Sequence, residues 1–134
     1  MSSSDIQSTF IEAAAAGTQT VSANASDVGN NAAMTLTASP YVTDQARKIT
    51  ITAANNQSGI SFTIVGLDET ATAATETLTG PTAGATVTST KYYSSVTSIT
   101  AVGNPGTAAG NISAGTGADI AAPIFRGDLR MRGM

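Results

Sequence analysis

Hydrophobic and polar residues alternate with a period of two along most of the chain after residue 31. In segment 47–53, for example, Ile49, Ile51 and Ala53 fall on one side and polar residues on the other. Such alternation is typical of half-buried β-strands. Clusters rich in Gly, Pro, Asn and Ser separate the alternating segments and predict turns. The expected strands cover residues 34–38, 47–53, 60–66, 75–79, 84–90, 96–102 and 110–115.

Short antiparallel strands at near-regular spacing predict an all-β fold, either a small sandwich or a Greek-key barrel. We assign this body to residues 32–117. An N-terminal arm, residues 1–31, precedes it, and a C-terminal extension, residues 118–134, follows it. In the arm, Ile6, Phe10 and Ala13 lie at helical spacing before Gly17, so its first part is either a short helix or an extended arm. The polar residues 18–31 predict a loop or a weak edge strand.

The C-terminal extension differs from the body in charge. Three arginines against one aspartate give residues 124–134 a net charge of +2, whereas three basic and eight acidic residues leave the rest at −5. Apolar residues are interleaved with these charges, which suits a strap that lies in a groove on an acidic neighbour. The alternative is a solvated chain end. The predicted partner-binding residues are Ile6, Phe10, Ile124, Phe125, Arg126, Leu129, Arg130, Met131 and Arg132.

Composition limits what the body can bury and bind. Hydrophobic residues make up 41% of the 134 residues but are weighted toward Ala and Val, and only 4% are aromatic. A thin core of this kind predicts that association with other subunits adds stability. The net charge of −3 and a pI near 4.5 argue against a nucleic-acid partner. No apolar stretch is long enough for a membrane helix, so no membrane partner is expected.

Candidate reacting groups are few. The chain has no His and no Cys, which excludes serine-type and cysteine-type triads and the commonest metal ligands. Asp68, Glu69 and Glu76 lie in one stretch where paired carboxylates would suit glycoside hydrolysis, but a polar loop is the expected reading. We therefore predict no enzymatic activity, no cofactor and no metal.

Several segments resemble a known class of protein. They are KITIT at 48–52, SGISFTIVG at 58–66, TETLTGP at 75–81 and VTSI at 96–99. Together they are similar to small structural proteins encoded among the head and tail genes of tailed bacteriophages. The resemblance covers roughly half of the chain and does not extend to residues 120–134. Its motifs specify strands and turns rather than chemistry, so it implies an architecture more directly than a role.

Within that class, the resemblance most nearly implies a decoration or cement protein on the outer surface of the head shell of the virion. The expected partners are the major capsid protein or other virion subunits, and further copies of the chain in a homo-oligomer, with a trimer as the natural symmetry. A tail, collar or head-to-tail joining component is the alternative. A host-binding or carbohydrate-binding β module comes next, and an enzyme last.

Overall fold

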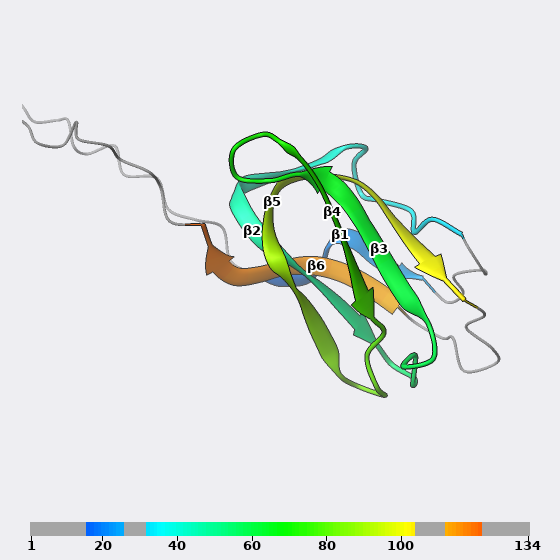
Figure 1. Cartoon of the computed structure of the whole chain (residues 1–134). Helices are drawn as coiled ribbons and strands as arrows, with labels where there is room; N and C mark the ends of the chain where they lie inside the picture. The colour runs from blue at the N-terminus through cyan, green and yellow to red at the C-terminus, as the bar shows by residue number, and fades with distance from the viewer. Residues whose placement is uncertain (1–15, 26–31, 104–111, 122–134) are drawn as a thin grey trace, which may run out of the picture.

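The computed structural model describes residues 16–25, 32–103 and 112–121, and every regular element in these ranges is a β-strand (Figure 1). All pairings between the strands are antiparallel. The predicted antiparallel all-β fold is therefore confirmed. The strands are β1 (Gly17–Ala25), β2 (Tyr41–Ala53), β3 (Ser61–Leu67), β4 (Ala73–Thr79), β5 (Thr86–Val102) and β6 (Ile112–Ile120).

These strands form one sheet in the order β1-β6-β2-β5-β3-β4, which is not closed into a barrel. The sheet nevertheless encloses one core, because side chains from both of its edge strands belong to the same buried cluster. Val21 comes from β1, and Ala74 and Leu78 come from β4 at the opposite edge. Figure 1 shows β3 and β4 drawn across β1 and β6. The sheet therefore bends so that its two ends face a common interior.

Strand β5 makes this bend possible because it changes neighbours along its 17 residues. Its first part, from Thr86 to Val96, pairs with β2, and its second part, from Ser95 to Val102, pairs with β3. The two strands expected over 84–90 and 96–102 are thus parts of one long strand. Bulges interrupt its pairing with both neighbours, and bulges increase local bending and twist.

Residues 34–38 do not form the strand that their alternation predicts. They instead span the gap between β5 and β1, where the Met34 amide donates to the Ile99 carbonyl (2.8 Å) and the Thr37 amide donates to the Val21 carbonyl (2.8 Å). The apolar alternation arises because Met34 is buried in the core and Leu36 packs against it. The prediction was wrong because burial on one side was read as strand pairing.

The polar segment that begins at residue 18 forms an edge strand, which was one of its two predicted states. Strand β1 pairs with β6, which continues to Ile120 and so runs beyond residue 117. The alternatives of a helix or an extended arm for the first residues concern positions outside the described ranges. The body thus includes parts of both segments that the sequence analysis set apart.

The core is built from aliphatic side chains and two aromatic ones, Phe62 and Tyr93, both fully buried. Tyr92 points to the outer side, where the Lys48 ammonium lies 5.3 Å from its ring centroid. Successive side chains of a strand point to opposite faces, so one of these adjacent tyrosines is internal and the other external. Full burial of one such aliphatic side chain contributes about 1.5–3 kcal/mol. The large, fully buried aliphatic side chains are Val21, Ile49, Ile51, Ile64, Val96, Ile99 and Ile112.

We expect Gly66→Ala to destabilise the fold by about 1–3 kcal/mol, because overpacking a closed interior costs that much. Gly66 lies next to a bulge between β3 and β5, and a Cβ there would overlap the backbone carbonyl of Ser95. Gly59 offers a matched control, since a Cβ added there meets nothing within 4 Å. Urea unfolding should show a clear decrease in the free energy of unfolding for Gly66→Ala and almost none for Gly59→Ala. Equal stability of the two variants would contradict the close approach.

Candidate functional site

The residues predicted to bind partners, Ile6, Phe10 and the set between Ile124 and Arg132, lie outside the described ranges. The structure does show where their segments leave the sheet. Gly17, which begins β1, is paired with Thr116 of the neighbouring strand β6. Ala121, just after β6, donates its amide to the Ala46 carbonyl (2.9 Å). Both terminal segments therefore leave the fold from the same end of two adjacent antiparallel strands.

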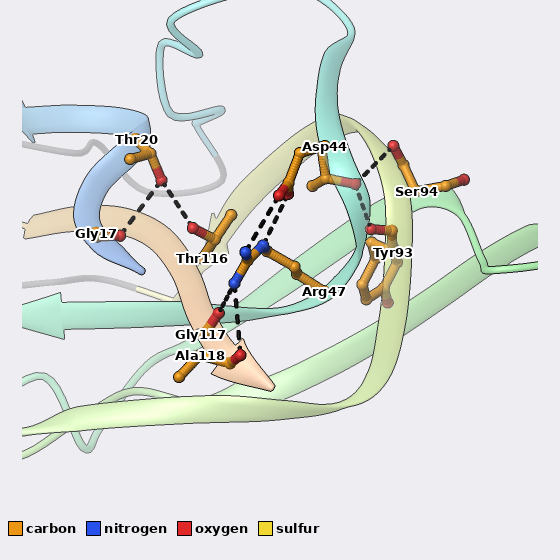
Figure 2. A network of polar contacts seen from close by, with 10 residues as sticks. Gly17, Thr20, Asp44, Arg47, Tyr93, Ser94, Thr116, Gly117 and Ala118 are labelled. Atoms are coloured by element: carbon orange, nitrogen blue, oxygen red, sulfur yellow. Dashed lines mark hydrogen bonds and ion pairs between the residues drawn. The ribbon is translucent and has the colours of Figure 1, made fainter. Parts of the chain in front are cut away.

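A buried arginine holds this end of the sheet together (Figure 2). Arg47 of β2 is only 2% exposed, and its guanidinium donates to both carboxylate oxygens of Asp44, with Nε–Oδ1 at 2.8 Å and Nη2–Oδ2 at 3.2 Å. Its Nη1 donates to the Gly117 carbonyl at 2.8 Å and to the Ala118 carbonyl at 3.5 Å. We call these four residues the Arg47 cluster. It joins β2 to residues near the end of β6.

Two threonines extend the same set of contacts to the flanking strands. The Thr43 hydroxyl, on β2, lies 3.0 Å from the carbonyls of both Tyr93 and Ser94 on β5. On the other side, the Thr20 hydroxyl of β1 lies 3.3 Å from the Thr116 hydroxyl of β6. Figure 2 shows these contacts around Arg47. Side-chain hydrogen bonds thus connect four strands, β1, β6, β2 and β5, at the end where the chain's terminal segments depart.

Glu76 of β4 makes a second link between strands. Its carboxylate accepts hydrogen bonds from the Thr90 amide (2.8 Å), the Thr90 hydroxyl (2.8 Å) and the Lys91 amide (3.1 Å) on β5. Lys91 in turn donates from Nζ to the Thr75 carbonyl (2.9 Å). Burial alone would raise the pKa of Glu76, but these hydrogen bonds outweigh it and lower the pKa. The ionised carboxylate therefore closes the gap between edge strand β4 and the first part of β5.

Asp68 organises the turn between β3 and β4. Its Oδ1 accepts hydrogen bonds from the Thr70 hydroxyl (2.7 Å), the Thr70 amide (2.8 Å) and the Thr72 amide (3.0 Å). These bonds, with the Thr70 side chain first, lower the pKa of Asp68. A general acid of a glycosidase needs a raised pKa instead. Asp68 and Glu76 thus act as hydrogen-bond acceptors that shape the backbone. Of the three carboxylates expected in a polar loop, Asp68 and Glu69 lie in the turn between β3 and β4, whereas Glu76 lies in β4.

Burial of Tyr93 leaves a polar atom inside the core. Its hydroxyl is buried and has no hydrogen-bond partner. Burial, with a smaller effect of the Glu76 charge, raises the pKa of Tyr93 to about 12. The phenol therefore stays protonated near neutral pH, and the ring serves mainly as the largest apolar filler on β5.

The outer side of β3, β4 and the second part of β5 carries no charged side chain. We call this surface the Thr face. Thr63 and Thr77 share a hydrogen bond across it (3.1 Å), and three exposed apolar side chains interrupt it: Val65 (36% exposed), Leu67 (38%) and Val102 (42%). The face is therefore polar but uncharged. Its outward residues are Ser61, Thr63, Val65, Leu67, Ala73, Thr75, Thr77, Thr79, Ser98, Thr100 and Val102.

Both edges of the sheet are partly covered. At β4, the Lys91 ammonium donates a hydrogen bond to the Thr75 carbonyl. At β1, the segment that contains Thr35 and Thr37 accepts from the Ser22 hydroxyl (2.7 Å) and donates to the Val21 carbonyl (2.8 Å). Covered edges of this kind hinder the addition of a foreign strand. The Thr face is thus an uncharged outer surface that neither covered edge obstructs.

Sequence reasoning missed Arg47 and the strand-linking role of Glu76. A signal for both was present, because each occupies an inward position of the alternating pattern. Arg47 shares the parity of Ile49 and Ile51, and Glu76 shares that of Leu78. A charge at an inward position of a strand predicts a buried or specifically paired group.

We expect Glu76→Gln to lower the free energy of unfolding by about 1–2 kcal/mol at pH 7, because charge-assisted hydrogen bonds are replaced by neutral ones. Since the folded state lowers the pKa of Glu76, its contribution is present above the ordinary value of 4.5 and is lost as pH falls through the lower folded value. The gap between the variant and the parent should therefore shrink at pH 3. Denaturant titrations at both pH values test this, with Glu69→Gln as the exposed control. A gap that is equal at both pH values would refute the role of the ionised carboxylate.

We expect Arg47→Lys to loosen the end of β6, because an ammonium keeps the charge but cannot form the two-pronged contact with Asp44 and also reach the Gly117 carbonyl. The free energy of unfolding should fall by about 1–3 kcal/mol. Hydrogen exchange should speed up most at the Ala121 amide. The reverse exchange at the neighbouring outer position, Lys48→Arg, is the control and should leave both quantities almost unchanged. Protection of Ala121 equal to that of the parent would show that the Arg47 cluster does not hold this end.

Within the described ranges, no helix is long and apolar enough to cross a membrane. The same residues contain no group of three or more His, Cys, Asp or Glu side chains that could hold a metal ion. No family model matches the chain, and no curated protein or solved structure shows a significant match to it.

Proposed function

We propose that the chain is a non-enzymatic structural protein of a tailed-bacteriophage virion, most nearly a decoration or cement protein that bridges capsid subunits on the outside of the head shell. The four sequence segments that resemble phage structural proteins fall in or beside β2, β3, β4 and β5. These strands supply most of the core and the whole Thr face. The resemblance therefore concerns the part of the fold that defines its shape and its main contact surface.

The Thr face is the observation that carries this proposal. Packing a surface against another protein removes it from water, and an unpaired charge in such a contact costs several kcal/mol. Removing Thr and Ser from water costs much less free energy, because their hydroxyls can bond to the backbone of the partner. Burial of Val65, Leu67 and Val102 is itself favourable. A specific interface needs about 800 Å² on each partner. The Thr face supplies part of that area, and the terminal segments are proposed to supply more.

The charges in the described ranges are consistent with a role in contact rather than chemistry. Asp44 and Arg47 pair with each other, Glu76 holds β5, and Asp68 shapes a turn. Each of these groups supports a strand or a turn. The proposed capsid partner would meet the uncharged face, while the basic and apolar residues between Ile124 and Arg132 would bind an acidic groove on it.

Purified particles of the virus that encodes the chain provide the test. We expect mass spectrometry to detect the protein and electron microscopy to place it at many equivalent positions of the icosahedral shell. Val65→Lys, which puts a charge in the middle of the Thr face, should lower its occupancy at least about tenfold if it removes 1.4 kcal/mol or more of contact energy. Thr88→Lys, at an exposed position of β5 paired with β2, is the matched control.

A chain that lacks residues 124–134 should also fail to enter particles while its strands keep the circular dichroism of the parent. Unchanged occupancy of that truncated chain would remove the strap from the proposal. A single ring of copies at one vertex would instead indicate a collar or head-to-tail joining component. Absence from purified particles, with binding to host glycans, would replace the virion role with that of a carbohydrate-binding module.

A further inference from the structure

Two charged residues that take no part in holding the sheet together lie close to each other at a bulge. Residues 117–119 of β6 all lie opposite Lys48 of β2, because the register between these strands shifts between Arg47 and Ile49. Asp119, the last residue of this bulge, is exposed. Among the described residues, neither Lys48 nor Asp119 forms an ion pair. These two charges therefore differ from those that bind strands and turns.

Lys48 and Tyr92 form a ridge on the outer side of the sheet. The two residues are direct partners in the pairing of β2 with β5, and the Lys48 ammonium lies 5.3 Å from the centroid of the Tyr92 ring. Both side chains are half-buried. A cation that lies over an aromatic ring is attracted to it, and the lysine stem is apolar. We call this pair the Lys48–Tyr92 ridge, a surface that combines apolar area with one positive charge.

Residues 117–119 form a low surface beside this ridge, which we call the 117–119 strip. A Cβ added at Gly117 would lie 3.7 Å from the Lys48 Cβ, an ordinary contact distance, so the glycine faces the same outer side. Arg47 binds two carbonyls of the strip from the inside of the sheet. The strip is therefore held in place, has no side chain at Gly117 and carries the negative charge of Asp119.

We propose that the Lys48–Tyr92 ridge of one copy of the chain packs on the 117–119 strip of a second copy, and the reverse, so that the free protein forms a two-fold symmetric dimer. The two surfaces are complementary in shape, because the lysine stem and the ring can cover Gly117. They are also complementary in charge, because the Lys48 ammonium can approach Asp119 of the other copy. Since ridge and strip are neighbours on one face, the same contact forms twice about a two-fold axis.

A dimer of this kind differs from the trimer that the resemblance to phage proteins implies, because a face that pairs with itself joins two copies. Burial of the stem and the ring supplies most of the contact energy, since exposed ion pairs contribute little. The dimer leaves the Thr face uncovered. The inference thus concerns the free protein and does not depend on a role in a virion.

Two charge reversals test the contact between copies. Lys48→Glu places like charges in both contacts of the dimer, and Asp119→Lys does the same with the opposite sign. Each variant alone should raise the Kd of the dimer at least about tenfold, as measured by sedimentation velocity. Mixed in equal amounts, the two variants should form a heterodimer of nearly parental affinity, because opposite charges then meet in both contacts. Native mass spectrometry with one variant isotopically labelled identifies the mixed dimer.

Matched controls separate this contact from effects of net charge and of folding. Glu69→Lys changes the charge as much as Asp119→Lys does, but it lies in the turn between β3 and β4 and should leave the Kd unchanged. Tyr92→Ser should raise the Kd at least about tenfold, because a tyrosine at a contact centre carries much of the binding energy. Each variant should keep the circular dichroism of the parent.

A parent chain that sediments as a monomer at every concentration measured would overturn the inference. So would two charge-reversed variants that fail to associate on mixing, or an oligomer that neither reversal weakens. An effect of Glu69→Lys equal to that of Asp119→Lys would show that net charge controls association, and it would also overturn the inference. None of these results bears on whether the protein is found in particles, so the virion role is tested separately.

Discussion

The fold depends on a single bent sheet that surrounds a core of mostly aliphatic side chains. Aliphatic residues fill most of this interior, and the rings of Phe62 and Tyr93 are fully buried among them. The sheet bends where β5 passes from β2 to β3, and a bend of this kind leaves backbone groups near the break without regular partners. Arg47 binds the Gly117 carbonyl at the irregularity between β2 and β6, and Glu76 binds the Thr90 amide beside β4. Specific polar contacts thus add to apolar burial in holding the bent sheet together.

The use of charged side chains to bind backbone groups is related to the lack of charge on the Thr face. Few charged residues are present, and in the described ranges most of those with assigned hydrogen bonds tie backbone segments together. The outer positions of β3 and β4 are occupied by Thr, Ser, Ala, Val and Leu. Threonine suits these positions because its branched Cβ favours strands and its hydroxyl remains compatible with water. The few charged side chains therefore hold the bent sheet together and are absent from the Thr face.

The alternation of apolar and polar residues was enough to predict the fold class and most strands, because sheet faces impose a period of two on side-chain burial. It failed at residues 34–38, where Met34 is buried although the backbone of the segment bonds to two strands, β5 through Met34 and β1 through Thr37. It also left β1 undecided, because a polar edge strand has the composition of a loop. Arg47 occupies an inward position of the alternation and has Asp44 three residues away, but its carbonyl partners at Gly117 and Ala118 are 70 and 71 residues away, so the sequence could indicate a buried or paired charge and not which strand it binds. The predicted partner-binding residues near the termini remain predictions.

The arrangement of edges and faces narrows the ways in which this chain can associate. Strand addition requires a row of free backbone groups, but Lys91 occupies a carbonyl of β4 and Thr37 donates its amide to β1. Contact through a face has no such obstacle where the face lacks charge. Contact through a terminal segment needs only that the segment be anchored, which the Arg47 cluster achieves at the end of β6. In the role proposed above, packing through the Thr face would leave the pairing of the strands unchanged, whereas strand addition would require the covered edges to open.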